Sequence, residues 1–130
     1  IIEKTEGDTA RVFQSQGPLE EESVNEMVVG AVLTSPGIAI TGGRLITGAD
    51  LHPTGNRVLI RVYTGSFEYR LGQGQTLADI GSIEPVLVAA GPLTEGQGEA
   101  IAYSADGIDV WTVSESQTPM QPLNFYRCTP

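Results

Sequence analysis

Cysteine and histidine are almost absent from this chain of 130 residues, which has one of each, Cys128 and His52. Cys128 cannot form a disulfide within the chain, and neither residue type is frequent enough for a cysteine-based metal cluster or a multi-histidine metal site. Cys128 has two readings: a small, half-buried apolar side chain, or one half of a disulfide to another polypeptide, which would suit a secreted protein. No Asn-x-Ser/Thr sequence supports secretion independently.

Basic side chains are also scarce, because seven lysines and arginines stand against sixteen aspartates and glutamates, for a formal net charge of −9. Negative charge opposes the attraction to phosphate backbones and anionic lipids, and fits cations or basic partners better. The sequence has no run of about 18 apolar residues, and an export signal, if there is one, is expected upstream of Ile1. We therefore expect no nucleic-acid binding and no membrane span.

What the sequence does contain is a series of short β-branched runs, in a composition that is 40 % hydrophobic. That content argues against wholesale disorder, and the length is typical of one domain. Ile46–Leu51 and Val58–Tyr63 flank the turn Pro53–Asn56 and predict a hairpin. Phe67–Leu71 and Pro85–Ala90 follow as third and fourth strands, so this stretch predicts a four-stranded antiparallel meander.

The segment between the third and fourth strands predicts one short surface helix. Thr76 stands three residues before Asp79, which is the spacing of a capping box, and Leu77 and Ile80 fall on one side of a helical turn. Glycines around this segment keep the helix short.

A second unit repeats the first. Superposing Gly55 on Gly107 sets an offset of 107 − 55 = 52 residues, which aligns Leu59 with Trp111. The unit contains three predicted strands, Ala100–Tyr103, Val110–Ser114 and Leu123–Arg127. Its last strand aligns at the larger offset of 57, since the second hairpin is longer by 57 − 52 = 5 residues.

An earlier, partial copy precedes both units. Residues 1–14 repeat the strand, hairpin and strand of the second unit, and Met27–Thr34 supplies an outer strand. A period of about 50 residues with four strands per unit is typical of β-propeller blades. The predicted fold class is all-β: a partial β-propeller of about two and a half four-stranded antiparallel blades with one short surface helix. Residues 1–130 would form the C-terminal portion of one propeller domain, with blades near 1–34 (partial), 46–90 and 99–130 (without its outer strand).

The phrases "ADLHPTGNRVLIRVYT" and "GEAIAYSADGIDVWTVSE" resemble the closing blades of a family of bacterial exported β-propellers, many of them of unassigned function. The resemblance covers most of the chain. It implies a propeller fold and an extracellular or periplasmic location, and it implies little about activity. The chain departs from the family pattern at His52 and Thr54, where Ser and Asp are commoner, and both positions lie in a turn.

The incomplete copies predict a partner polypeptide. The first copy lacks its inner strand and the last lacks its outer one, and soluble proteins protect such strand edges. We expect the N-terminal portion of the same propeller, as a separate or unrecorded chain, to pair alongside Leu123–Arg127, with Cys128 near that seam.

Candidate catalytic residues are few. His52 stands beside Pro53 at the corner of a turn, where a polar side chain is expected to face water. The sequence lacks the Gly-x-Ser-x-Gly motif of many serine hydrolases, and "GQGQTL" lacks the Gly-Lys-Ser/Thr ending of a phosphate loop. No catalytic or cofactor-binding residue is assigned.

Carboxylates are the candidate metal ligands. Asp50 and Glu99 lie on the first strands of the two nearly complete units, and these strands line the central channel of a propeller. Converging carboxylates there would bind a hard cation, calcium most readily, because calcium accepts six to eight oxygen ligands in loose geometry. The alternative is that both are solvated or hydrogen-bonded to backbone amides. Glu6 and Glu115, at equivalent positions, could line the channel mouth.

Several functions fit this pattern. The leading one is a binding or scaffold module that engages a protein or a small ligand, with a channel calcium ion as the candidate cofactor. The alternative is a calcium-dependent propeller hydrolase of the lactonase or phosphoesterase type, in which the metal polarises a substrate oxygen. A purely structural role in a cell-surface assembly is the third. Tyr63, Tyr103 and Trp111 are expected to pack between blades, against the alternative of a ligand-stacking platform.

Overall fold

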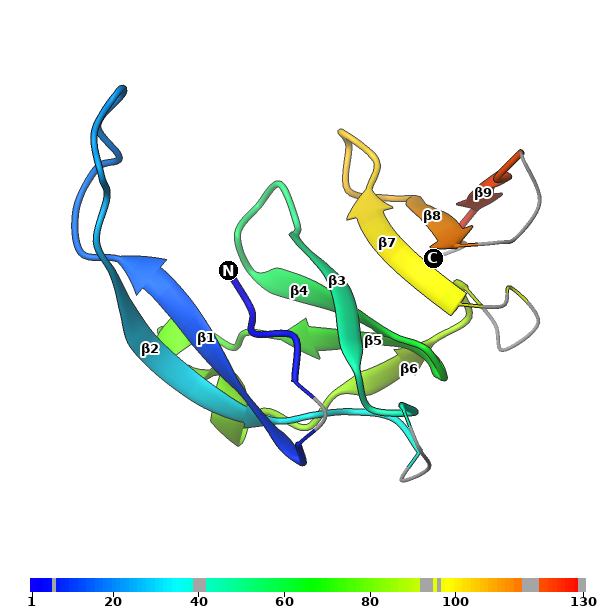
Figure 1. The fold of residues 1–130 in the computed structure, drawn as a ribbon, viewed down its shortest axis with the longest axis horizontal. Helices are drawn as coiled ribbons and strands as arrows, with labels where there is room; N and C mark the ends of the chain where they lie inside the picture. The colour runs from blue at the N-terminus through cyan, green and yellow to red at the C-terminus, as the bar shows by residue number, and fades with distance from the viewer. Residues whose placement is uncertain (6, 39–41, 92–94, 96, 116–119, 129–130) are drawn as a thin grey trace.

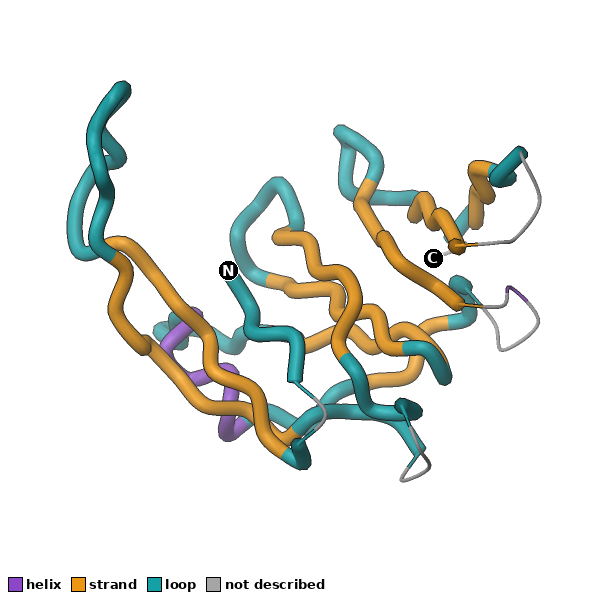
Figure 2. Tube along the Cα trace, viewed as in Figure 1, coloured by secondary structure: helices purple, strands orange, loops and turns teal. Residues whose placement is uncertain are grey.

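The structure is a computed structural model, and it describes all residues except 6, 39–41, 92–94, 96, 116–119 and 129–130. The described part contains antiparallel sheets of two, four and three strands, which lie side by side (Figure 1, Figure 2). The predicted all-β class is confirmed. None of the helical segments described is long and apolar enough to cross a membrane.

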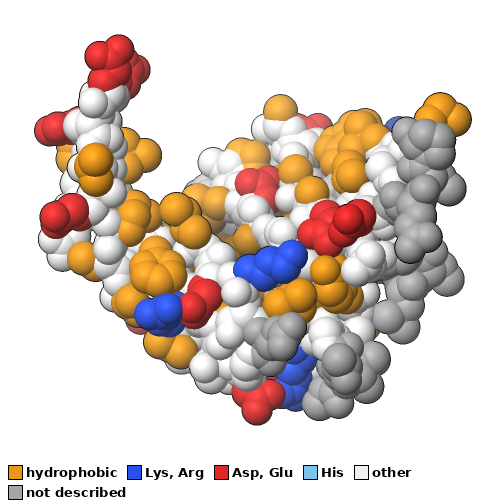
Figure 3. Space-filling view, viewed as in Figure 1, with side chains coloured by type: hydrophobic (Ala, Val, Ile, Leu, Met, Phe, Trp, Pro, Cys, Tyr) orange, Lys and Arg blue, Asp and Glu red, His pale blue; other side chains and the backbone are white. Residues whose placement is uncertain are grey.

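The first sheet pairs β1 (Thr9–Ser15) with β2 (Met27–Thr34). The first residues of the chain extend it on the free side of β1, since Ile2 forms an antiparallel bridge with Val12. The connection between the two strands, residues 16–26, projects from the body of the protein in Figure 1, and acidic side chains gather along this arm in Figure 3.

The second sheet has the order β3-β4-β5-β6. Its strands are β3 (Ile46–Leu51), β4 (Arg57–Val62), β5 (Gly65–Arg70) and β6 (Val86–Val88). The four strands predicted here are all present. β3 has the predicted bounds. The prediction of β6 is the least accurate of the four, since only three of its six predicted residues pair with β5.

The predicted helix is present as η1 (Leu77–Ser82), a single 3-10 segment. Its capping box is formed as predicted: the Ala78 amide donates to Thr76 Oγ1 at 3.3 Å, and the Thr76 amide donates to Asp79 Oδ2 at 2.8 Å. Ile80 is buried and packs this segment into the core between the first and second sheets.

The third sheet has the order β7-β8-β9, with β7 (Gln97–Tyr103), β8 (Val110–Glu115) and β9 (Leu123–Tyr126). Its three strands were predicted, and β7 begins three residues earlier than expected.

The first turns of the second and third sheets have the same geometry. Gly55 and Gly107 both have a φ of +74°, which favours glycine. The Gly55 amide donates to the His52 carbonyl at 2.7 Å, and the Gly107 amide donates to the Ser104 carbonyl at 2.8 Å. The offset of 52 residues therefore aligns equivalent turns.

The strand registers agree as well. Val58 lies opposite Tyr69 in the second sheet, and Val110 lies opposite Tyr126 in the third. This is the alignment that the two sequence offsets predict.

The apolar core consists of two clusters, one on each side of the second sheet. The cluster toward the first sheet contains Ala10, Val12, Leu33, Ile46, Val58, Ile60, Val62, Tyr69 and Ile80. The cluster toward the third sheet contains Leu59, Ala90, Ile101, Tyr103 and Val110. Because successive side chains of a strand point to opposite faces, β4 contributes alternate residues to both clusters.

Candidate functional site

Asp50 lies on β3, as predicted, and joins that strand to the third sheet. Its Oδ1 accepts a hydrogen bond from the Leu51 amide at 2.9 Å, and its Oδ2 accepts one from the Tyr103 amide on β7 at 2.8 Å. Both carboxylate oxygens therefore already receive backbone donors, which was the stated alternative to a cation site.

Glu99 lies on β7, also as predicted. Its Oε1 accepts a hydrogen bond from the Tyr63 hydroxyl at 3.1 Å, and its Oε2 lies 3.7 Å from Lys4 Nζ. Burial, and then the bond to Glu99, raise the pKa of the Tyr63 hydroxyl above its ordinary value. An ammonium group beside the carboxylate competes with any metal cation for it.

The strands that carry these two carboxylates approach closely. Thr47 Oγ1 on β3 donates to the Gly98 carbonyl on β7 at 2.5 Å. A Cβ at Gly48 would lie 3.1 Å from Ala100 Cα, so glycine permits this approach. Within the described residues, no group of three His, Cys, Asp or Glu side chains is placed to hold a metal ion. The calcium site stays a prediction.

Two other carboxylates were predicted near the channel mouth. Glu6 lies outside the described residues. Glu115 ends β8 and is exposed, so its position gives no support to a shared ligand set.

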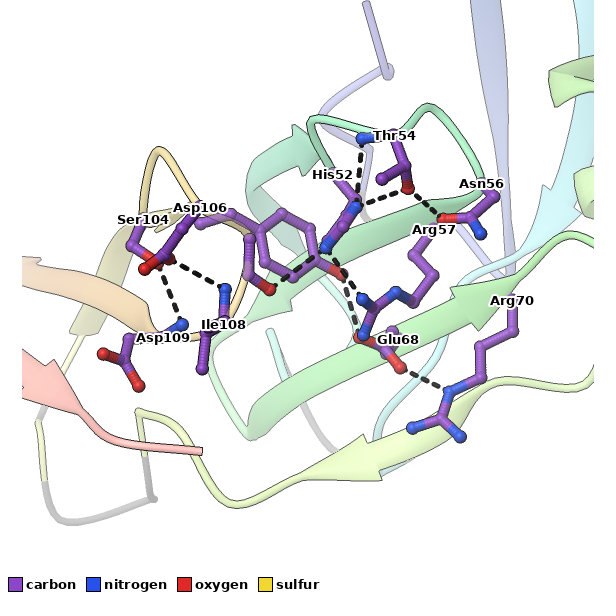
Figure 4. Close-up of polar contacts among 12 residues, drawn as sticks. His52, Thr54, Asn56, Arg57, Glu68, Arg70, Ser104, Asp106, Ile108 and Asp109 are labelled. Carbon is purple, nitrogen blue, oxygen red and sulfur yellow. Dashed lines mark hydrogen bonds and ion pairs between the residues drawn. The ribbon is translucent and has the colours of Figure 1, made fainter. Parts of the chain in front are cut away.

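A pocket of about 550 Å³ lies between the second and third sheets. Its polar wall is formed by His52, Arg57, Glu68, Arg70 and Tyr103 (Figure 4). These side chains come from the ends of β4 and β5, from β7 and from the turn after β3, and they form a connected polar network on this side of the second sheet.

His52 does not face water, and that prediction is wrong. Its side chain lies against the third sheet, with only 5 % of the residue exposed. The Thr54 amide donates to Nδ1 at 3.1 Å, and Nε2 lies 3.0 Å from the Gly107 carbonyl. The ring also meets Tyr103 edge-on at 4.8 Å, while Arg57 Nη2 approaches Nε2 to 2.8 Å. The turn would be solvated in an isolated hairpin, but the turn of the next sheet covers it.

Glu68 is the centre of the network (Figure 4). Its Oε1 accepts hydrogen bonds from the Tyr103 hydroxyl at 2.9 Å and from Arg57 Nη1 at 3.4 Å, and its Oε2 accepts one from Arg70 Nε at 2.5 Å. Burial acts to raise the pKa of Glu68, but the bonds from Arg70 and Tyr103 and the two guanidinium charges outweigh it, so the pKa is lowered. Burial, and then Glu68, raise the pKa of Tyr103. Glu68 is therefore a charged acceptor and Tyr103 a protonated donor.

Cys128 is a free, half-buried cysteine that lines the same pocket. Its amide donates to Asp109 Oδ1 at 3.1 Å. Burial, followed by the charges of Asp109 and Glu68, raises the pKa of the thiol. The reading of Cys128 as a half-buried side chain is confirmed, and a disulfide to another polypeptide stays a prediction.

A second buried network joins the same two sheets near the other end of β4. Arg61 is fully buried, and its Nη2 lies 3.3 Å from Glu95 Oε2. The contact is an ion pair without hydrogen-bond alignment, since neither Nε nor Nη2 makes a hydrogen bond to a described residue. Burial lowers the pKa of Arg61, and Glu95 opposes this. Glu95 also accepts hydrogen bonds from the hydroxyls of Thr112, at 2.9 Å, and Tyr126.

The prediction for the aromatic residues holds in part. Tyr103 packs between the second and third sheets, but Trp111 is 37 % exposed and faces away from them. Sequence reasoning also missed Arg57, Glu68 and Arg61. The available signal was a charged residue inside a buried strand, which requires a partner.

Comparison with known proteins does not identify the chain. No protein-family model matches it, and no curated protein shows significant sequence similarity to it.

Gly107 should be more sensitive to substitution than its equivalent, Gly55. Both have the same positive φ, so alanine should cost about 1 kcal/mol of stability at either position for the left-handed backbone. At Gly107 the new Cβ would lie 2.1 Å from His52 Nε2, whereas at Gly55 it meets nothing within 4 Å. We expect Gly107→Ala to cost about 1–3 kcal/mol more than Gly55→Ala, because the ring must move. Urea unfolding measures both, and equal losses would show that His52 is not held against Gly107.

Glu68 should stabilise the fold in a pH-dependent manner. Its folded pKa is lowered, so its contribution is present above the unfolded pKa of about 4.3 and is lost as the pH falls through the folded value. Glu68→Gln should lower the free energy of unfolding by about 2 kcal/mol near neutral pH. The difference in stability between the variant and the unmodified protein should become smaller in acid. Urea unfolding across this pH range tests it, with exposed Glu21→Gln as the control. A difference that stays constant contradicts the assignment.

Proposed function

We propose that the three sheets are successive blades of a β-propeller and that the chain acts as a binding or scaffold module, outside the cell or in the periplasm. Its partner would be a further β-sheet, seated on the outward face of the third sheet. The alternation of side chains on β4 and β8 is the observation that supports this most directly.

The inward faces of the two strands are equivalent. Val58 and Ile60 on β4 pack toward the first sheet, and Leu59 packs toward the third. On β8, Val110 packs toward the second sheet, and Thr112 is bonded to Glu95 there. In each of these two sheets, alternate side chains of the second strand pack against the preceding sheet.

The outward face of the third sheet is apolar but lacks a covering sheet among the described residues. Trp111 lies opposite Phe125, with ring centroids 4.6 Å apart, and Val113 lies opposite Leu123. Trp111, Leu123 and Phe125 are 37 %, 62 % and 43 % exposed. At the position equivalent to Trp111, Leu59 is only 1 % exposed, because the third sheet covers it. A patch of this kind is typical of an interaction surface.

Strand edges support the same partner. β9 pairs with β8 on one side, and no described strand pairs with it on the other. A strand added beside β9 would satisfy this edge, and a further sheet stacked on the face would cover the patch; the N-terminal portion of the same propeller could supply both. Cys128 follows β9 by two residues, but its side chain lines the pocket on the inward side of the third sheet.

The test uses Trp111, the single tryptophan, as the reporter. Its emission should shift to the blue when the chain associates with the proposed N-terminal portion of the propeller or with a second copy of itself. Leu123→Glu should weaken that association about tenfold or more, because a carboxylate would be buried unpaired. The matched control is Val24→Glu, at a residue that is 96 % exposed on the projecting arm. A monomer with unshifted emission at all concentrations, with or without the proposed partner, would overturn the proposal.

A calcium-dependent hydrolase is the alternative, supported by the position of Asp50 and Glu99 on neighbouring strands. The fit is partial. Both oxygens of Asp50 accept backbone amides, and Lys4 lies beside Glu99, so a calcium ion would need further oxygen ligands from elsewhere. The binding module therefore ranks first.

Calcium binding has a direct test. If Asp50 and Glu99 hold calcium, the ion should raise the melting temperature by mass action, and the double variant Asp50→Asn/Glu99→Gln should abolish that rise. The shift between calcium and chelator is compared within each variant, because Asp50 also has a structural role. Glu21→Gln, at an exposed residue of the projecting arm, is the control. Equal melting curves of the unmodified protein with calcium and with chelator count against the site.

A further inference from the structure

The pocket between the second and third sheets is lined by apolar as well as polar side chains, and Leu59 lies directly opposite Glu68 on neighbouring strands. Leu59, Val88, Ile108 and Val110 make up its apolar wall. Leu59 and Val110 are buried, and Ile108 is 57 % exposed at the rim. The volume of about 550 Å³ is in the range of small-molecule sites.

The polar wall places two positive charges beside one negative charge. Arg57 and Arg70 lie directly opposite each other on β4 and β5, an arrangement that destabilises a strand pair when the charges are alike. Glu68 is the carboxylate that pairs with both, and Figure 4 shows the two guanidinium groups directed at it. The lining also contains Asp106, so two carboxylates stand against the two guanidinium groups, and any anion recognition here depends on donors of the arginines that are still unused rather than on net charge.

Arg70 is the side chain with capacity to bind more. It is 65 % exposed, and its Nε donates to Glu68. Its two terminal nitrogens make no hydrogen bond to a described residue, so they offer a planar pair of donors that suits a carboxylate. The other acidic residue of the lining, Asp106, lies on the facing turn, where its Oδ1 accepts hydrogen bonds from the Ser104 hydroxyl at 2.5 Å and the Ile108 amide at 3.0 Å.

We propose that this pocket binds a small molecule with a carboxylate group and an apolar body. Arg70 binds the carboxylate, and Val88 and Ile108, the more accessible apolar side chains of the lining, contact the apolar part. A planar acceptor fits the guanidinium fork, and the apolar wall gives the ligand a reason to leave water. The pocket is on the inward side of the third sheet, so it is separate from the outward face proposed for a protein partner.

The test uses Cys128, the single thiol, as a reporter inside the pocket. The rate of its reaction with a maleimide is measured at mildly alkaline pH with hexanoate, benzoate, hexanamide, hexylamine, acetate or inorganic phosphate present. Hexanoate and benzoate should slow the reaction several-fold and raise the melting temperature of the protein. Hexanamide, hexylamine, acetate and phosphate should do neither at the same concentration.

Variants assign the effect to Arg70. Arg70→Gln should weaken carboxylate protection about tenfold, and Arg70→Lys should weaken it less, since it keeps the charge but not the fork. The control is Arg11→Gln, because Arg11 forms an exposed ion pair with Glu3 on the first sheet. Circular dichroism checks that each variant is folded.

Each other outcome overturns the proposal in a specific way. If hexanamide or hexylamine protects Cys128 as well as hexanoate does, the pocket recognises only the apolar part of the ligand. Equal protection by acetate or phosphate shows an anion site that makes no use of the apolar wall. Unchanged protection in Arg70→Gln removes Arg70 from the site. No protection and no thermal shift with any carboxylate shows that the pocket does not bind this class. None of these results bears on the partner of the outward face, which is measured through Trp111.

Discussion

One constraint organises the structure: β4 is buried on both of its faces. A strand with no side facing water must find a partner for every side chain, so its sequence "RVLIRV" is nearly continuous in apolar residues. Val58 and Ile60 complete the core with the first sheet, while Leu59 completes the core with the third. The two interfaces are therefore coupled through one strand. Of its two arginines, Arg57 is partly exposed, whereas Arg61 is fully buried and requires the ion pair with Glu95 because its guanidinium has no access to water.

The two interfaces of the second sheet differ in chemistry. Toward the first sheet the contacts described are mainly apolar, whereas toward the third an apolar centre at Leu59 lies between two polar networks, around Glu68 and around Glu95. Buried ion pairs add little net stability against apolar contacts, but a misplaced one is costly. These networks therefore fix how the third sheet sits on the second more strictly than apolar packing would. Close approach of glycine contributes too, because a Cβ at Gly98 would lie 2.1 Å from Arg61 Nε.

Local pattern was enough to predict the strands, the capping box and the alignment of the two units, since each depends on residues that are neighbours in sequence. It failed where burial is decided by another sheet. His52 sits in a turn that looks solvated until Gly107 approaches it from the next unit, 107 − 52 = 55 residues away. Trp111 is a large apolar residue of the kind expected in a core. It is exposed because no sheet in the part of the chain that is described covers it. The pocket combines side chains from both sheets, so only Glu68 and Arg57, as charges in buried strands, could have pointed to it.

The two faces of the third sheet imply different kinds of recognition. The inward face contacts the second sheet through paired charges and hydrogen bonds. Because these contacts are directional, they are satisfied in only one alignment of the two sheets. The outward face offers Trp111, Val113, Leu123 and Phe125, whose burial is favourable over a range of positions because apolar contact is non-directional. Side chains alone would thus leave a partner's position on this face loosely defined. The backbone edge of β9 supplies what the side chains lack, because strand pairing admits only discrete registers and a shift of one residue reverses the faces of the added strand. Affinity at this face would come from the apolar patch, and alignment from the edge.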